Sequence, residues 1–107
     1  MMYIVEIGSQ AALDKFISNP MLSLVFFWSD SNDLCRGAIR IVDELVYESK
    51  GDMIAASVNV DEVKELAQRY NISSVPAFLF FKHGNLVDKA IGPRPKQFLR
   101  EMIDRGQ

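Results

Sequence analysis

Cys35 is the residue best suited to covalent chemistry, and it is the one cysteine among 107 residues. A lone thiol has two interpretations. It is either a small buried hydrophobe or a monothiol that forms a mixed disulfide with glutathione or a client protein. Asp33 and Asp30 oppose thiolate formation, whereas Arg36 and a helix N-terminus favour it. Because burial also disfavours the anion, we expect a thiol pKa at or above ~8.5, the value for a free cysteine.

Two other polar residues have simple structural interpretations. Asn32 is expected to cap a helix, because its side-chain oxygen can accept a hydrogen bond from the N–H two or three residues later, including that of Cys35. His83 stands next to Gly84 and is expected to be an exposed turn residue, since a lone histidine without partners is not a metal site. With no metal or nucleotide motif in the sequence, we expect no cofactor.

Composition and charge narrow the class of protein. A formal net charge of -2, with scattered Lys and Arg residues, makes nucleic acid a poor candidate partner. The longest apolar run, residues 24–28, is far below the ~20 residues needed to cross a bilayer, and no signal peptide is visible. A single cysteine indicates a reducing compartment. We therefore expect a cytoplasmic protein without a membrane segment.

The elements that must position these residues alternate between strand and helix patterns. A length of 107 residues and 49% hydrophobic content predict one globular domain, residues 1–107. Strands are predicted at residues 2–7, 22–28, 53–60, 77–81 and 86–91. The last two form a hairpin through a turn at residues 82–85. The pattern predicts an α/β fold of order βαβαβαββα, with a mixed central sheet of about five strands flanked by four helices.

The predicted helices have recognisable ends and apolar faces. Ser9 is expected to cap the first helix, Gly51 to end the second and Asp61 to cap the third. The predicted inward faces have helical spacing and comprise Ala12, Leu13, Phe16 and Ile17; Ala38, Ile41, Val42, Leu45 and Val46; Val63, Leu66, Ala67 and Tyr70; and Phe98, Leu99, Met102 and Ile103.

Several segments together resemble the thioredoxin family. Residues 27–36, FWSDSNDLCR, look like the family's active-site segment, in which a strand ending in Phe-Trp leads through Cys-Gly-Pro-Cys-Lys into a helix. Residues 58–61, residues 70–84 and the pair Ile91-Gly92 also agree with the family in type and spacing. The resemblance covers almost the whole chain and implies the thioredoxin fold.

The resemblance also assigns positions in the active-site segment. The family's first cysteine falls on Asn32 and its second on Cys35. It implies that the Val75-Pro76 peptide is cis and lies beside the loop carrying these two residues. The backbone of Val75 would then be exposed to pair with an extended peptide.

Other departures from the family concern proton transfer. The family's buried Asp falls on Phe26, and the Lys that faces it falls on Ser57. Neither residue moves a proton as a carboxylate does. The family's proline after the second cysteine falls on Arg40, which removes the expected cause of a helix kink.

Two functions follow from the resemblance and its departures. The first is a non-catalytic module that binds a protein or peptide partner through Trp28, Asn32, Asp33, Leu34, Val75 and Pro76. The second is a monothiol thiol-disulfide oxidoreductase acting through Cys35 on a cysteine-containing partner. Reactivity at Cys35 separates the two, and the sequence leaves the partner's identity and the oligomeric state open.

Overall fold

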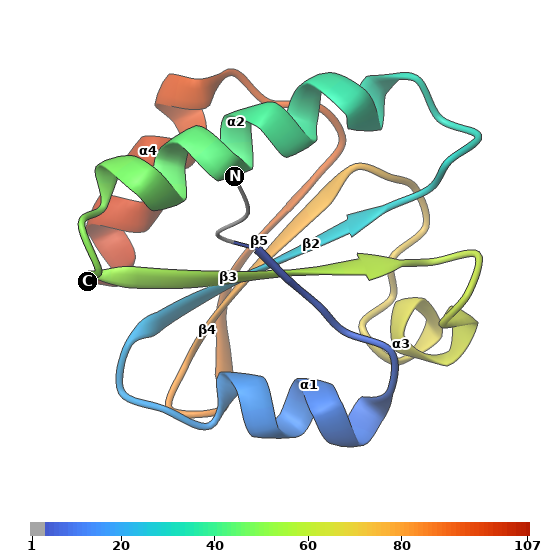
Figure 1. Ribbon diagram of the computed structural model, residues 1–107, viewed down its shortest axis with the longest axis horizontal. Coiled ribbons are helices and arrows are strands. Elements are labelled where there is room, and N and C mark those ends of the chain that lie inside the picture. Colours follow the sequence, from blue (N-terminus) through green and yellow to red (C-terminus); the bar gives the residue numbers. More distant parts are fainter. Residues whose placement is uncertain (1–3) are drawn as a thin grey trace.

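A mixed five-stranded sheet forms the centre of the molecule (Figure 1). The computed structural model describes residues 4–107. The strand order is β1-β3-β2-β4-β5, with β1 and β2 parallel to β3, and with β4 antiparallel to both β2 and β5. The strands are β1 (Ile4–Glu6), β2 (Leu22–Trp28), β3 (Met53–Asn59), β4 (Ala77–Lys82) and β5 (Asn85–Ile91). The predicted mixed sheet is confirmed; residues 2 and 3 of the first predicted strand lie outside the described residues.

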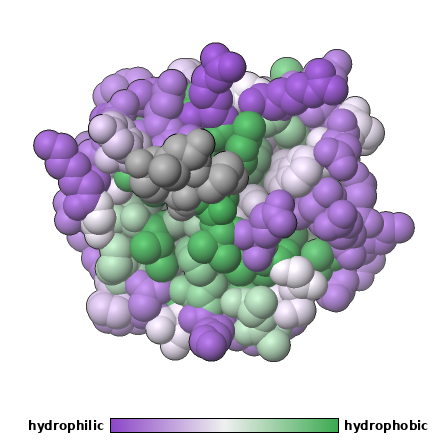
Figure 2. All heavy atoms as spheres, in the orientation of Figure 1, coloured by the Kyte–Doolittle hydropathy of each residue, from purple (hydrophilic) through white to green (hydrophobic). Residues whose placement is uncertain are grey.

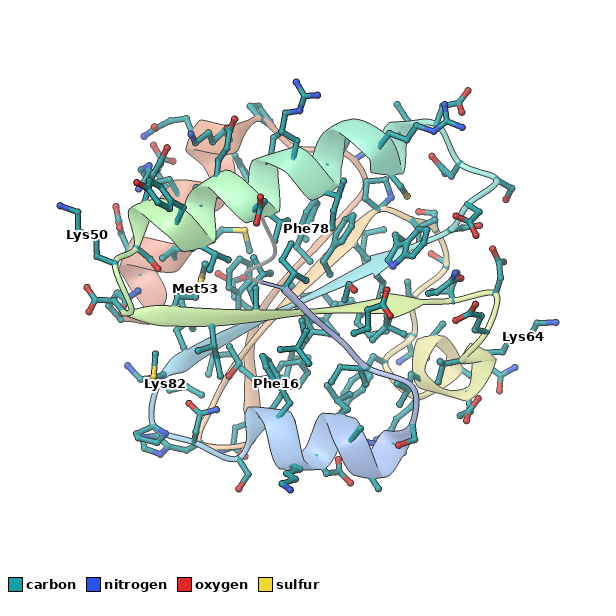
Figure 3. The ribbon with its side chains drawn as sticks, in the orientation of Figure 1. Phe16, Lys50, Met53, Lys64, Phe78 and Lys82 are labelled. Atoms are coloured by element: carbon teal, nitrogen blue, oxygen red, sulfur yellow. The ribbon has the colours of Figure 1, made fainter. Side chains whose placement is uncertain are left out.

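Four helices cover the sheet in two layers (Figure 1). The helices α1 (Gln10–Ile17) and α3 (Lys64–Arg69) pack on one face, whereas α2 (Leu34–Glu48) and α4 (Lys96–Gly106) pack on the other. Side chains reach the sheet from both sides in Figure 3, where Phe16 of α1 and Phe78 of β4 lie in different layers. The predicted α/β layered architecture is therefore confirmed.

Strand β2 is buried on both faces because it is the middle strand. Its residues alternate between the two cores: Leu24 and Phe26 face α2 and α4, whereas Val25 and Phe27 face α1 and α3. All four are 0% exposed. A strand covered on both sides has no need of polar alternation, which is why its sequence is a nearly continuous apolar run.

Some predicted helix ends are confirmed and others are wrong. The Ser9 hydroxyl accepts a hydrogen bond from the Ala12 N–H at 3.1 Å, as a cap should. Asp61 caps no helix: α3 begins at Lys64, and the Asp61 carboxylate accepts a hydrogen bond from the Ser29 hydroxyl at 2.6 Å. That bond joins two loops 32 residues apart. The Asp61 carboxylate therefore makes a tertiary hydrogen bond, although the local sequence pattern predicted that it would cap α3.

Other predicted details also differ. Helix α2 ends at Glu48, three residues before Gly51, whose φ of 92° places it in the left-handed region. On α1, Ala12 is exposed although it was expected to face inward. On α4, Phe98 is 43% exposed and lies under the Arg94 guanidinium, 5.4 Å from the ring centroid. Ala12 and Phe98 fit the apolar periodicity of their helices, but neighbouring apolar residues fill the core in their place.

The fold brings three loops together at the carboxyl ends of β2 and β3. The loop after β2 leads into α2, the loop after β3 leads towards α3, and the loop after α3 leads into β4; all three lie on the right in Figure 1. The edge where parallel strands end is the usual place for a site in an open α/β sheet.

Candidate functional site

A tight turn joins Asn32 to Cys35 at the start of α2. The Cys35 N–H donates to the Asn32 backbone carbonyl at 3.1 Å, and the Leu34 N–H donates to Asn32 Oδ1 at 2.9 Å. The prediction that Asn32 caps the helix is therefore wrong in position: its side chain accepts from the Leu34 N–H, but Asn32 lies one residue before the N-cap. Asp33 occupies the N-cap position and makes no side-chain cap bond. The turn is held mainly by Asn32.

Asn32 also reaches the loop before β4. Its Nδ2 donates to the Val75 carbonyl at 2.9 Å, across 43 residues of sequence. The Val75-Pro76 peptide bond is cis, Pro76 is buried and Val75 is half-buried. One amide side chain thus bonds two loops, with its oxygen on the α2 turn and its nitrogen on Val75.

Cys35 is buried beneath the first turn of α2. Its relative exposure is 3%, and it belongs to the core that α2 and α4 form with the sheet. Burial raises the pKa of the Cys35 thiol, and a hydrogen bond with the Ser29 backbone offsets part of that rise. The expected direction is therefore confirmed. Asp33 is not among the causes: its carboxylate is 89% exposed and lies 3.7 Å from Arg36.

Three of the six predicted binding residues line one of two hollows, whereas Asp33, Leu34 and Pro76 line neither of them. An outer groove of about 300 Å³ is lined by Asn32 and Val75, together with Ile72 and residues 73–74. Trp28 instead lines an inner cavity of about 250 Å³ that reaches Cys35. Leu34 is 56% exposed beside the turn. The structure therefore brings Asn32, Val75 and Pro76 together and places Trp28 on the inner cavity.

Sequence reasoning missed Ser29 at this site, and it noted Ser57 only as the position that matches a lysine of the family. Ser29 is buried, and its hydroxyl lies 3.0 Å from that of Ser31 and donates to Asp61. Ser57 is 6% exposed and lines the inner cavity opposite Cys35. A serine carries no pattern that distinguishes a buried side chain from a solvated one, so neither residue was predicted as part of the site.

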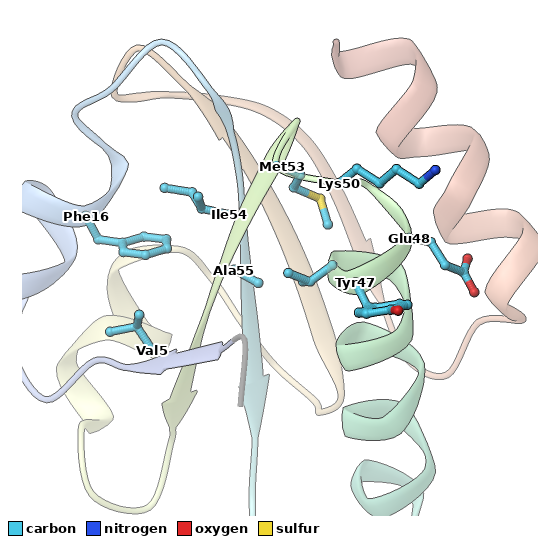
Figure 4. Close-up of a pocket in the computed structure, with 10 residues that line it drawn as sticks. Val5, Phe16, Tyr47, Glu48, Lys50, Met53, Ile54 and Ala55 are labelled. Carbon is cyan, nitrogen blue, oxygen red and sulfur yellow. The ribbon is translucent and has the colours of Figure 1, made fainter. Parts of the chain in front are cut away.

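A larger hollow lies elsewhere. A cavity of about 780 Å³ opens between α1 and α2 beside the β1 and β3 edge, lined by Val5, Phe16 and Tyr47 among others (Figure 4). Figure 2 shows apolar side chains gathered on this side of the molecule, with hydrophilic ones around them. It includes neither Cys35 nor Asn32, so it is separate from the candidate site.

Within residues 4–107 the acidic residues, the single histidine and the single cysteine are dispersed. No group of three His, Cys, Asp or Glu residues there is placed to hold a metal ion. His83 is exposed in the β4–β5 turn with a φ of 54°. No described helix is both long and apolar enough to span a bilayer.

Comparison with known proteins gives consistent matches. The Thioredoxin family model matches residues 4–105. A chloroplastic M-type thioredoxin of Pisum sativum is 39% identical over 102 residues, which cover 94% of this chain and 59% of the pea protein. Thioredoxin 1 of a Nostoc species is 34% identical over 82 residues, covering 77% of each chain. The crystal structure of Fasciola hepatica thioredoxin superposes with a TM-score of 0.91 at 30% identity, covering 97% of this chain and 100% of that one.

Proposed function

Because this chain belongs to the thioredoxin family, we propose that it is a non-catalytic module that binds a protein or extended peptide through the surface around Val75-Pro76. In this proposal Asn32 stands where the attacking cysteine of the family would be, so the dithiol cycle is lost. The chain spans 59% of the length of the pea relative. The evidence for a partner therefore comes from the residues of this chain.

The hydrogen bond between Asn32 and Val75 is the observation that carries the proposal. Asn32 Nδ2 donates to the Val75 carbonyl at 2.9 Å and so holds the turn against the loop before β4. An amide cannot attack a disulfide, but it can fix the geometry of two loops that a partner would contact together. The bond therefore supports recognition in place of turnover.

The backbone of Val75 supports an edge-pairing mode of binding. Within residues 4–107 its N–H makes no hydrogen bond, whereas its carbonyl is taken by Asn32. A bound peptide would accept from the Val75 N–H and lie along the outer groove. The exposed Leu34 beside the turn supplies an apolar contact for a partner side chain.

The rival function is a monothiol enzyme acting through Cys35 by mixed disulfide. The inner cavity reaches Cys35 and gives this function its one structural support. Against it stand the 3% exposure of Cys35 and the raised pKa, because the thiolate is the attacking species. The partner class, a protein or peptide, is shared by both functions.

A capture experiment separates the two functions. The immobilised protein, Cys35→Ser, Leu34→Ala and the control Leu86→Ala are compared for retained proteins; Leu86 is also exposed, at 44%, but lies on β5. We expect Cys35→Ser and Leu86→Ala to retain the same proteins as the wild type, and Leu34→Ala to retain several-fold less. Loss of the partners in Cys35→Ser, with their release from the wild type by dithiothreitol, would establish the monothiol enzyme instead.

A further inference from the structure

Arg94 lies beside the proposed peptide surface, in the loop between β5 and α4. Its Nη1 atom is 3.5 Å from the point that a Cβ atom on Gly92 would occupy. The Gly92 N–H in turn donates to the Pro76 carbonyl at 2.7 Å. The guanidinium therefore packs over a backbone that has no side chain, and a single hydrogen bond joins that backbone to the residue after the cis peptide bond.

Two contacts hold the Arg94 side chain in this position. Its Nη1 atom donates to the Pro93 carbonyl at 3.0 Å, and its Cζ atom lies 5.4 Å from the centroid of the Phe98 ring. Arg94 is half-buried, and the prolines on either side of it, Pro93 and Pro95, restrict the backbone of the loop. A guanidinium that is already held in place loses less conformational freedom when it binds a ligand.

Within residues 4–107 the Arg94 guanidinium forms no ion pair. Three other arginines of this part of the chain do form ion pairs: Arg36 with Asp33, Arg100 with Glu48 and Arg105 with Asp88. The contacts of Arg94, a carbonyl and a ring face, leave its positive charge without a carboxylate. A guanidinium carries several N–H donors in a planar fork that fits the two oxygens of a carboxylate. Arg94 is therefore suited to bind a carboxylate from outside the chain.

Val75 lies between the outer groove and Arg94. Its side chain packs against both cores, the one beneath α2 and α4 and the one beneath α1 and α3. The outer groove is on the α3 side, where Ala67 and Ile72 line it, whereas Arg94 is on the α4 side, against Phe98. Successive side chains of an extended peptide point to opposite sides. A peptide paired with the Val75 N–H therefore directs one side chain to the outer groove and its neighbour towards Arg94.

We propose that the peptide partner carries an aspartate or glutamate next to the residue that pairs with Val75, and that Arg94 binds this carboxylate. The contact presupposes the proposed function, because it needs a peptide that pairs with Val75. The groove side has the opposite preference: Asp61 accepts a hydrogen bond from Ser29, which lines the outer groove, and its charge disfavours a second carboxylate there. The acidic side chain is therefore expected at a fixed position of the partner.

Selection from a random peptide library displayed on phage tests the preference. The immobilised wild type is compared with Arg94→Gln and with Arg69→Gln, a matched control because the Arg69 guanidinium also lies over a ring, 5.7 Å from the centroid of Tyr70, but on α3. We expect Asp or Glu at one fixed position in the peptides selected by the wild type and by Arg69→Gln, and not in those selected by Arg94→Gln. Selected peptides with no acidic residue at a fixed position would overturn the inference.

A titration followed by NMR then measures the contact. One selected peptide is synthesised with Glu at the fixed position and again with Gln there; the chemical shift of the Val75 amide reports pairing, and the other backbone amides report folding. We expect the wild type to bind the Glu peptide at least about fivefold more tightly than the Gln peptide. This preference should persist in Arg69→Gln, fall in Arg94→Lys, which lacks the planar fork, and disappear in Arg94→Gln.

The Val75 amide distinguishes a failure of this inference from a failure of the proposed function. Equal affinities for the two peptides, with the Val75 amide shifted by both, would overturn the role of Arg94 and leave the peptide surface in place. No shift of the Val75 amide with either peptide would overturn both.

Discussion

The two ends of the turn between Asn32 and Cys35 differ in what surrounds them. Asn32 is half-buried, bonds to Val75 and lies beside an open groove, whereas Cys35 is 3% exposed and packs in the core beneath α2. In the proposed function the outer end belongs to the recognition surface, while the inner end holds a thiol without a partner thiol. If the proposed function holds, the difference means that a substitution at one end of the turn can change binding without changing the reactivity of the thiol.

The largest predicted effect is on stability, and it comes from a substitution in the core beside Cys35. Phe26 is 0% exposed and its ring stacks on Phe78 at 5.5 Å between centroids. Phe26→Asp should therefore lower the free energy of unfolding by about 4 kcal/mol or more, because it leaves a cavity and buries a carboxylate. Urea denaturation measures it, with Phe26→Leu as the control, expected to cost under about 1.5 kcal/mol. A smaller loss for Phe26→Asp would mean that the interior already accommodates a carboxylate.

The next prediction compares the rate of disulfide reduction by this protein with that of an ordinary thioredoxin. We expect reduction of a protein disulfide, driven by dithiothreitol or a thioredoxin reductase, to be at least about 100-fold slower than with an ordinary thioredoxin, because Asn32 stands in place of the attacking thiol. Insulin reduction followed by turbidity measures it. Turnover within about tenfold of an ordinary thioredoxin would contradict the loss of the dithiol cycle.

The burial of Cys35 predicts slow alkylation. At neutral pH, iodoacetamide should modify the folded protein at least about tenfold more slowly than the same chain in urea, because the thiol is buried and its pKa is raised. Mass spectrometry at timed intervals measures both rates. Rapid modification of the folded protein at pH 6 would favour the monothiol enzyme.

The smallest expected effect is a pH dependence of stability. Since the pKa of Cys35 is raised in the folded state, the neutral thiol contributes stability that is fully present below the pKa of the unfolded chain. That stability should be lost as the pH rises through the folded-state pKa. Cys35→Ala should lack this loss, so the two unfolding curves should converge at alkaline pH. Parallel curves from pH 7 to pH 10 would contradict a buried titrating thiol.

The sequence predicted the sheet and its layers well because burial on both faces leaves a strong pattern. Residues 22–28 were predicted as a strand, and β2 has those bounds. The errors lie where tertiary contacts overrule local signals. Asp61 is bonded to Ser29 and not to a helix end, and Phe98 is left at the surface beside Arg94.

The candidate site was predicted in part. The grouping of Asn32, Val75 and Pro76 followed from the resemblance to thioredoxins, and the structure places the three together. The positions of Trp28 and Ser57 on the inner cavity did not follow. Both depend on the packing of α2 over β3, which is a contact between elements that no local spacing encodes.

The most direct test of the central claim restores the missing thiol. The Asn32–Cys35 turn is closed by a hydrogen bond of 3.1 Å between the backbone atoms of its end residues, so two cysteines there should reach bridging distance with little movement. Asn32→Cys is oxidised mildly, its free thiols are counted and its disulfide reductase activity is compared with that of the wild type. The account predicts no free thiols and turnover at least about tenfold above the wild type, yet below an ordinary thioredoxin because Phe26 relays no proton. Two free thiols after oxidation, or turnover equal to the wild type, would contradict it.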